Sequence, residues 1–429
     1  MIKVLNMKLP YAVEKAMKKI MDAGGQAFLV GGALRDWLLG LPVSDYDIAT
    51  SFLPGQVEKI FSDEKTWPSG KRFGTITVEI AGTVIEITTF RRESGYSDSR
   101  HPDKVTFVTD IHQDLSRRDF TVNAMAYNPF ISSSFVDPFG GRKDLQNRII
   151  RTVGNPFERF TEDPLRIMRG VRLAAQLGFE IERDTESAMK NCSSMIRNVS
   201  SERIRSEFDR LLLSQRPDDG LLLLQETSVL PQLLGTDTIN LKAESCRIIR
   251  SMEPEPAYRL SALFSILYPE DFANADRLNF IKNRLTQLRY DKKTVHNTLK
   301  LLAGCSRLAS MDISLYSIRE LLGSMGTAYA RQCIKWYEAI CQLNKNPSAC
   351  ERARQAASLM EEVIRRNDPV FFHQLAVDGN HIKQAGIGLK DPRIIGEALN
   401  LAYRWVLEDP ARNDTEQLIA MLKKHYSLP

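Results

Sequence analysis

Two aspartates and a later glutamate are the residues of this chain best suited to hold a metal ion. Asp45 and Asp47 are separated by one residue at the start of a short apolar run. Residues two apart on a strand point to the same face, so the two carboxylates would lie a few ångströms from each other. Such like charges are unfavourable unless a cation lies between them, and hard oxygen ligands suit Mg²⁺. Glu86, expected on another strand, would be the third catalytic carboxylate.

A pair of glycines precedes these aspartates. Gly31 and Gly32 lie between an expected strand and an expected helix in the stretch LVGGALRD. Glycine lets the backbone approach a phosphate closely, and the start of a helix presents unpaired N–H groups to an anion. The stretch therefore predicts a phosphate-binding turn beside the carboxylates.

Two further clusters combine arginine with carboxylate or amide groups. In RRDFTVNAM, Arg117 and Arg118 offer forked donors for phosphate oxygens, and Asp119 and Asn123 could hold a ribose hydroxyl. In EDPLR, Asp163 and Arg166 are three residues apart in the expected first turn of a helix, which would place an acceptor and a donor on one face. Such a pair could bind the Watson–Crick edge of a nucleobase.

Each motif also has a purely structural interpretation. The aspartates would mark a solvated strand end, the glutamate an exposed strand position, and the glycines an ordinary turn. The double arginine would begin a basic helix with an aspartate cap. The EDPLR pair would be a common ion pair at a helix start, worth a few tenths of a kcal/mol. Taken one at a time, the motifs do not decide between these interpretations.

The elements that would position these residues change character near residue 150. Before that point, short strands alternate with helices, as expected for a mixed sheet with helices around it. We expect helices at 11–23, 33–39 and 119–127, strands at 27–30, 46–49, 75–80, 83–89 and 105–108, and a mobile polar loop at 91–104. From residue 156 onward helical periodicity dominates, starting with 164–177.

This single change of pattern predicts an α+β fold, with a small head up to about residue 150 and a long helical body and tail after it.

Composition excludes several other classes of protein. The chain has 429 residues, 43% of them hydrophobic and 26% charged, which is typical of a globular protein. No stretch approaches the roughly 18 apolar residues of a membrane span, and the N-terminal segment is not a signal peptide. Six cysteines lack CxxC spacing and six histidines form no metal-binding pair, so we expect reduced thiols and a cytoplasmic protein. The net charge of +5 only mildly favours a polyanionic partner.

The motifs GGALRD, DYD, RRDFTVNAM and EDPLR occur in this order. In this respect the chain resembles the class II tRNA nucleotidyltransferases, the CCA-adding enzymes of the DNA polymerase β superfamily, which share their head with bacterial poly(A) polymerases. The resemblance covers 28–178, continues through SERIRSEF at 201–208, and has a later echo at 375–399. It implies three parts: a catalytic, polymerase β-like nucleotidyltransferase head at 1–150, a helical nucleotide-recognition neck at 151–230, and a long all-helical body and tail at 231–429 that would bind tRNA.

The resemblance also implies roles for individual residues. Asp45 and Asp47 would bind catalytic Mg²⁺, and Asp119 would favour ribonucleotides. Asp163 and Arg166 would form the amino-acid template that selects C and A. The remaining nucleotide-binding residues would shape the triphosphate pocket, contact triphosphate and ribose, or support the site from the next helices: Gly31, Gly32, Arg35, Asp36, Arg117, Arg118, Asn123, Arg203, Arg205 and Glu207.

The implied reaction adds C, C and A from CTP and ATP to the 3′ end of tRNA and releases pyrophosphate by two-metal phosphoryl transfer. The helical tail would bind the acceptor and elbow region of the tRNA. The stretch GTITV at 74–78 argues against a poly(A) polymerase. An intact flexible loop argues against CC-only addition; its residues include Arg91, Arg92, Glu93, Tyr96, Asp98 and Arg100.

Two alternatives remain open at this point. Addition of A alone is compatible with the same motifs. An RNA-binding protein with an inactive head is the non-enzyme alternative, although both aspartates of DYD are present. An added HD phosphohydrolase is not expected, because the chain has no HD dipeptide. The oligomeric state cannot be inferred.

Overall fold

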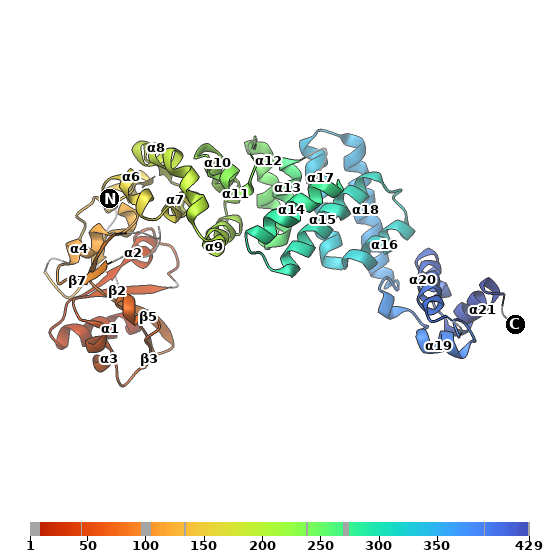
Figure 1. The fold of residues 1–429 in the computed structure, drawn as a ribbon, viewed down its shortest axis with the longest axis horizontal. Helices are drawn as coiled ribbons and strands as arrows, with labels where there is room; N and C mark the ends of the chain where they lie inside the picture. Colours follow the sequence, from red (N-terminus) through yellow and green to blue (C-terminus); the bar gives the residue numbers. More distant parts are fainter. Residues whose placement is uncertain are drawn as a thin grey trace. The chain divides into compact units, whose positions relative to one another are not determined.

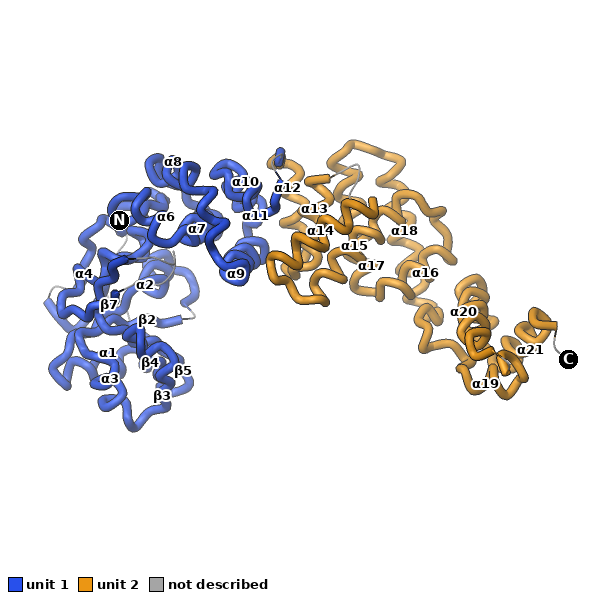
Figure 2. The backbone as a smooth tube through the Cα atoms, viewed as in Figure 1, with its two compact units in different colours: residues 1–240 blue, residues 241–429 orange. Residues whose placement is uncertain are grey.

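The computed structural model describes residues 9–43, 45–95, 104–132, 134–236, 239–268, 274–389 and 391–427. The chain divides into two compact units, Met1–Asn240 and Leu241–Pro429, which Figure 2 shows in different colours. The expected head and neck both lie in the first unit. Their separation at residue 150 stays a prediction, as does the boundary at 230.

A seven-stranded mixed sheet forms the N-terminal part of the first unit (Figure 1). The strand order is β3-β4-β5-β2-β1-β8-β9, and β2 pairs with β5 in parallel while its pairing with β1 is antiparallel. The alternating pattern of 75–80 and 83–89 forms the antiparallel pair β4 and β5, as expected. The strands are β1 (Ala27–Val30), β2 (Tyr46–Thr50), β3 (Lys65–Trp67), β4 (Thr75–Ile80), β5 (Thr83–Thr89), β8 (Ala126–Tyr127) and β9 (Phe135–Val136).

One face of the sheet packs against helix α4. Phe28, Ala49 and Ala126 lie on this face and form a buried cluster with Ile111 and Leu115 of the helix. Burial of their apolar side chains holds the helix against this face of the sheet. The helices of this region are α1 (Tyr11–Asp22), α2 (Gly31–Leu38), α3 (Pro54–Ile60), α4 (Ile111–Ser116) and α5 (Gly141–Asn147), with a short 3₁₀ turn η1 at Lys71–Phe73.

The expected mobile loop at 91–104 begins as a strand instead. Strand β6 (Arg91–Ser94) pairs antiparallel with β7 (Lys104–Phe107), which corrects the prediction for Arg91, Arg92 and Glu93. The sequence did not predict this strand because it has no apolar face. Its side chains Arg91 and Glu93 instead form hydrogen bonds with each other and with other polar groups. Tyr96, Asp98 and Arg100 lie outside the described residues.

The expected helix at 119–127 is wrong. The segment has a single 3₁₀ turn, η2 (Thr121–Asn123), followed by strand β8. Backbone bonds hold the residues before this turn in extended form, since Thr121 N–H donates to Arg151 O and Val153 N–H to Asp119 O. Tertiary pairing therefore overrides the local helical pattern.

A group of helices follows the sheet within the first unit. Strand β11 (Glu180–Ile181) interrupts the helices that were expected to continue from 156, and it pairs in parallel with β10 (Ile149–Ile150), which precedes them. The remaining elements are α6 (Pro156–Glu162), α7 (Leu165–Leu177), α8 (Arg183–Cys192), η3 (Ser193–Asn198), α9 (Ser201–Leu212), α10 (Pro217–Glu226) and α11 (Val229–Leu234).

The second unit is helical throughout its described residues. Its last three α-helices share a buried apolar cluster that includes Ile382, Ala402 and Leu418. The helices are α12 (Ala243–Ser251), α13 (Pro256–Leu267), α14 (Ala275–Gln287), α15 (Lys292–Ser310), α16 (Leu315–Met325), α17 (Thr327–Leu343), α18 (Pro347–Arg366), η4 (Phe372–Gln374), α19 (Gly379–Gln384), α20 (Arg393–Glu408), η5 (Pro410–Arg412) and α21 (Thr415–His425). In the described part of the chain, no helix is long and apolar enough to cross a membrane. All six cysteines are buried free thiols.

Candidate active site

A row of paired strand residues forms one wall of a cavity of about 770 Å³ in the first unit. Asp47 on β2 lies opposite Val30 on β1 and opposite Glu86 on β5, and Glu86 lies opposite Thr77 on β4. All four residues line the cavity. Asp45 immediately precedes β2, is exposed, and does not belong to the lining. The structure therefore brings Asp47 and Glu86 together and leaves Asp45 at the edge.

The pKa of the Asp47 carboxyl is raised to about 6. Burial is the main cause, the charge of Arg118 opposes it, and the nearby charges of Glu86 and Asp45 act in the same direction as burial. A cation beside Asp47 would reverse this effect by stabilising the charged form. The described residues contain no ready group of three His, Cys, Asp or Glu side chains that could hold a metal. A Mg²⁺ ion here would need oxygen ligands from substrate and water, which is usual for this ion.

Gly31 allows the chain to pass close to this carboxylate. Its φ of +71° is in the left-handed region, and an added Cβ would lie 3.1 Å from Asp47 Oδ2 and 3.2 Å from Arg118 Nη1. A larger residue would be strained there and would crowd both side chains. Gly31 and Gly32 line the cavity and are the first two residues of α2, which begins two residues earlier than the helix expected at 33–39; their binding of phosphate stays a prediction.

Arg35 and Asp36 lie behind the cavity rather than in its lining. Arg35 forms an ion pair with Asp36 at 2.7 Å, and its Nη1 donates to Asn123 Oδ1 at 2.7 Å. Asn123 does line the cavity. Arg35 therefore contacts a residue of the cavity lining, Asn123, and Asp36 forms an ion pair with Arg35.

The end of α4 supplies two cavity arginines. The buried carboxylate of Asp114 accepts from Arg117 Nη2 at 2.9 Å and from Arg118 Nη2 at 3.1 Å. Burial opposes the charge of Asp114, but the two guanidinium groups outweigh it and lower the pKa of this carboxyl. The Nε atom of Arg118 is buried without a hydrogen-bond partner in the described residues. Asp114 thus holds both arginines in place, and Arg118 keeps a donor that could bind an anion.

Strand β6 adds a second acidic anchor to this wall. Glu93 Oε1 accepts from Arg91 Nε at 2.8 Å and from Arg117 Nη1 at 3.2 Å. Arg91 also donates through Nη1 to the carbonyl of Phe73. Arg91, Glu93 and Phe73 line the cavity, whereas Arg92 does not.

Asp119 has a partner that the sequence interpretation missed. Its Oδ2 accepts from Arg169 Nε at 2.8 Å and from Arg169 Nη2 at 2.7 Å. Burial disfavours its charge, but Arg169 more than compensates, so the pKa of Asp119 lies well below its usual range. Asp119 and Arg169 both line the cavity. Arg169 lies three residues after Arg166 on α7, and this helical spacing was the available signal.

Asp163 and Arg166 both line the cavity, but they do not share the first turn of a helix as expected. Asp163 has an extended backbone between α6 and α7, and its Oδ1 accepts from the N–H of Leu165, the first residue of α7. Its Oδ2 forms an ion pair with Arg203 on α9 at 2.8 Å. Arg166 lies on α7 and forms an ion pair with Glu162 at 2.6 Å. Pro164 explains the break, because proline disfavours a helical backbone in the residue before it.

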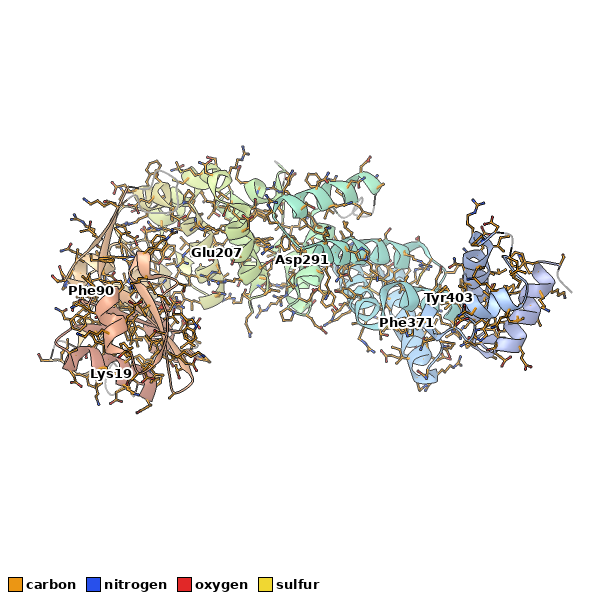
Figure 3. All side chains as sticks on the ribbon, turned by 60° about the horizontal axis from the view of Figure 1, so that its bottom comes forward. Lys19, Phe90, Glu207, Asp291, Phe371 and Tyr403 are labelled. Carbon is orange, nitrogen blue, oxygen red and sulfur yellow. The ribbon has the colours of Figure 1, made fainter. Side chains whose placement is uncertain are left out.

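Of the three α9 residues that the sequence analysis named, only Arg203 lines the cavity. Arg205 forms an ion pair with Asp209 on its own helix and is not in the lining. Glu207, labelled in Figure 3, accepts from Arg172 Nε at 2.6 Å and joins α9 to α7. Asp114 and Arg169 are the charged site residues that the motifs did not single out.

A carboxylate row at one wall and six arginines around it give the cavity the groups needed to transfer a nucleotide from a triphosphate. The arginines are Arg91, Arg117, Arg118, Arg166, Arg169 and Arg203. This fold and site define the class: a polymerase-type nucleotidyltransferase.

Comparison with known proteins agrees with this class. The family described as "Poly A polymerase head domain" matches residues 27–151, and "Probable RNA and SrmB- binding site of polymerase A" matches 178–235. A CCA-adding enzyme of Pediococcus pentosaceus is 33% identical over 413 residues, which cover 95% of this chain and 96% of that protein. One from Ligilactobacillus salivarius is 47% identical over 224 residues, or 52% of this chain and 54% of that protein.

A solved structure is similar along the whole chain. The CCA-adding enzyme of Bacillus stearothermophilus, in complex with CTP, superposes with a TM-score of 0.78 at 30% identity and covers 98% of both chains. The chain belongs to the CCA-adding enzymes, which are tRNA nucleotidyltransferases.

Proposed function

We propose that this chain adds C, C and A to the 3′ end of tRNA, using CTP and ATP and releasing pyrophosphate. The observation that carries the proposal is the cavity in which Asp47 and Glu86 face a set of anchored arginines. The similar Bacillus stearothermophilus enzyme binds CTP. The 33% identity to a CCA-adding enzyme over nearly the whole chain supports the same nucleotides and tRNA as substrates here.

Asp45 and Asp47 are the residues we infer to hold Mg²⁺, with Glu86 beside them. Their oxygen donors suit this ion, and the raised pKa of Asp47 reflects burial and nearby like charges that a cation would offset. When bound, two Mg²⁺ ions would supply activation of the RNA 3′-hydroxyl and charge neutralisation of the departing pyrophosphate.

Arg117 and Arg118 would bind the triphosphate. Asp114 orients both guanidinium groups toward the cavity wall, and Arg118 Nε is a buried donor without a partner in the described residues. A phosphate oxygen would satisfy donors of this kind. Gly31 and Gly32 leave room for the phosphates beside Asp47.

Asp163 and Arg166 would select the base. Ion pairs to Arg203 and Glu162 hold the two side chains at the cavity. A carboxylate that accepts and a guanidinium that donates can match the edges of cytosine and adenine, whose exocyclic amines donate hydrogen bonds. The same pair could therefore accept both nucleotides and reject UTP and GTP.

The second unit would bind the acceptor and elbow region of the tRNA. It is helical in its described residues, and the chain as a whole carries a net charge of +5. A protein that recognises a folded RNA by its shape and phosphates needs an extended, positively charged surface more than it needs contacts to particular bases. Six free, buried thiols fit the reducing cytoplasm in which we expect the enzyme to act.

Three tRNA transcripts test the proposal: one that ends before CCA, one after C and one after CC. Each is incubated with the protein, Mg²⁺ and one labelled nucleotide at a time. The proposal predicts C addition to the first two and A addition only to the third. Addition of A alone to the third, with no C addition to any, would identify an A-adding enzyme. Long A tails on all three would indicate a poly(A) polymerase, and no addition at all would contradict the proposal.

A further inference from the structure

The row of paired strand residues at the cavity wall continues to a tryptophan at the edge of the sheet. Trp67 on β3 lies opposite Thr77, which lies opposite Glu86, which in turn lies opposite Asp47. Directly paired residues point to the same face of a sheet, so Trp67 shares the face of the two carboxylates. Strand β3 is an edge strand (Figure 1). With about 4.8 Å between strands, Trp67 lies roughly 10 Å from Glu86 and roughly 14 Å from Asp47.

The indole ring of Trp67 is accessible and is held at the rim of the cavity. Among the four tryptophans, all in the described part of the chain, only Trp67 is exposed, at 37%. The turn after it leads into the cavity, since Ser69 and Gly70 belong to the lining and Thr75 N–H donates to Gly70 O at 3.1 Å. Lys65 Nζ lies 5.0 Å from the centre of the ring. The rim therefore carries an aromatic surface beside a positive charge.

Trp67 and the arginines inferred to bind phosphate lie on different sides of Asp47. Gly31 directly follows β1, and a Cβ added to it would lie 3.2 Å from Arg118 Nη1. Strands β5, β4 and β3 follow one another on the other side of β2. Because the attacking and leaving oxygens lie roughly in line in phosphoryl transfer, an RNA 3′-hydroxyl reaches Asp47 from the side away from the leaving phosphates. That side leads to Trp67.

We propose that Trp67 stacks on one of the last two bases of the RNA that is being extended and thereby positions the 3′-hydroxyl at Asp47 and Glu86. An aromatic ring can stack on any base, which suits a site that must hold a different 3′ end at each addition step. Lys65 would contact a phosphate of the same strand, since sites for single strands combine stacking rings with basic residues. The inference rests on the proposed function, because it assumes that RNA is extended in this cavity.

The test measures kcat and KM for tRNA that ends in CC, with saturating ATP. Trp67→Ala should lower kcat/KM for tRNA by about tenfold, because one base–aromatic stack contributes about that much to binding of single strands. Trp67→Phe should keep most of the activity. Trp67→Leu, which is apolar but not aromatic, should resemble Trp67→Ala. The KM for ATP should not change in any of these variants.

A second arm changes the RNA instead of the protein. The tRNA ending in CC is prepared with an abasic residue at the last or at the penultimate position, and each form is given to wild-type enzyme and Trp67→Ala. At the stacked position, wild-type enzyme should lose about as much kcat/KM as Trp67→Ala loses on intact tRNA, and the two losses should not multiply. A folding defect would not give this pattern, because it lowers activity on every RNA by the same factor.

Tyr11→Ala is the matched control. Tyr11 is an aromatic residue of α1 that is 70% exposed and lies outside the cavity lining, so its removal should leave kcat/KM for tRNA unchanged. Melting temperatures show whether each variant is folded. If Trp67→Ala does not fold, Trp67→Leu takes its place in the comparison with abasic RNA.

Three results would overturn the inference. The first is an unchanged kcat/KM for tRNA in Trp67→Ala. The second is equal activity of Trp67→Leu and Trp67→Phe, which would show that an apolar side chain suffices. The third is a pair of losses that multiply at both abasic positions. Failure of the proposed function looks different, since wild-type enzyme would then add no nucleotide to intact tRNA ending in CC.

Discussion

Asp47 and Glu86 occupy directly paired positions on two neighbouring parallel strands, β2 and β5, although 39 residues separate them in the sequence. The pairing brings two carboxylates from segments that are distant in the sequence to the same wall of the cavity. It also explains why Glu86 is among the charges that raise the pKa of Asp47. The first prediction concerns what these carboxylates do.

Asp47→Asn should reduce nucleotide addition by several orders of magnitude, because it removes the carboxylate that we propose as a metal ligand while keeping the side-chain shape. Asp45→Asn should do the same if it is the second ligand. Stability should not fall, since each change relieves a like-charge pair. Single-turnover addition to tRNA and thermal unfolding measure the two effects. Glu79→Gln is the control, as this glutamate lies on β4 outside the cavity lining. Undiminished turnover of Asp47→Asn with Mg²⁺ would remove Asp47 from the metal site.

The raised pKa of Asp47 leads to a pH dependence of metal binding. Since this pKa is raised from 3.8 to about 6, chiefly by burial, the metal-free folded protein keeps a proton on Asp47 below about pH 6. The same shift means that Asp47 contributes stability that is lost as the pH rises through about 6. Mg²⁺ must displace the proton, so its affinity should fall about tenfold per pH unit below pH 6 and level off above it. Calorimetric titration between about pH 5 and pH 8 measures this. Asp47→Asn should show no such inflection, and a flat wild-type profile would contradict the prediction.

The glycines, Asp47 and several arginines of the cavity lining could be predicted from the sequence, because they belong to local patterns, whereas Asp45 of the same pattern lies outside the lining. The parallel pairing of β2 with β5 could not, since it joins distant segments and no local period specifies it. Arg169 was missed for the same reason: its partner Asp119 lies 50 residues earlier. The helix expected at 119–127 failed because backbone pairing with residues 151–153 competes with local propensity and wins.

Arg319 on α16 should be a major determinant of stability in the second unit. It forms a buried ion pair with Asp368 at 2.7 Å, with side-chain exposures of 5% and 7%. Its Nη1 also donates to the carbonyl of Leu407 at 2.9 Å, near the end of α20. Nearby, Tyr403 of α20, labelled in Figure 3, donates to Val370 O at 2.7 Å. Breaking such a buried pair leaves one charge uncompensated, so Arg319→Met should destabilise the protein by about 3 to 5 kcal/mol.

Denaturant unfolding measures this loss, and hydrogen exchange should show faster opening of α20 in the variant. Arg331→Met is the control, because the Arg331–Glu361 pair is about half exposed on both sides. Exposed pairs contribute about 0 to 1 kcal/mol, so the control should unfold close to wild type. Equal stability of the Arg319 and Arg331 variants would show that the buried pair is not needed.

Basic residues on the last helices should affect binding of tRNA more than binding of ATP. Lys383, Arg404 and Lys424 are exposed on α19, α20 and α21, outside the buried cluster of these helices. Replacing all three with Gln should raise the KM for tRNA and make it less dependent on salt, since fewer counter-ions are released on binding. The KM for ATP should not change. Deleting the chain after about residue 370 should give a larger effect of the same kind.

Replacing Lys18, Lys59 and Lys143 of the first unit with Gln gives a control of equal charge change, because all three are exposed and outside the cavity lining. Steady-state kinetics at several salt concentrations compare the two triple variants. Equal changes in both KM values for the variant of the last helices would indicate that these helices do not bind RNA selectively.

The final prediction is that Asp163 and Arg166 choose the base. Each hydrogen bond to a correct base contributes about 1 kcal/mol, and a wrong base leaves a buried group unpaired at a cost of about 1 to 3 kcal/mol. Asp163→Ala or Arg166→Ala should therefore increase incorporation of UTP and GTP relative to CTP and ATP, while metal and tRNA binding change little. Competition assays with all four nucleotides measure this. A purely structural role is the alternative, because Asp163→Ala also removes the ion pair with Arg203, and Arg166→Ala removes the one with Glu162. If both variants remain faithful and lose only stability, the two residues serve as structural links between α6, α7 and α9, and base selection must reside elsewhere in the cavity.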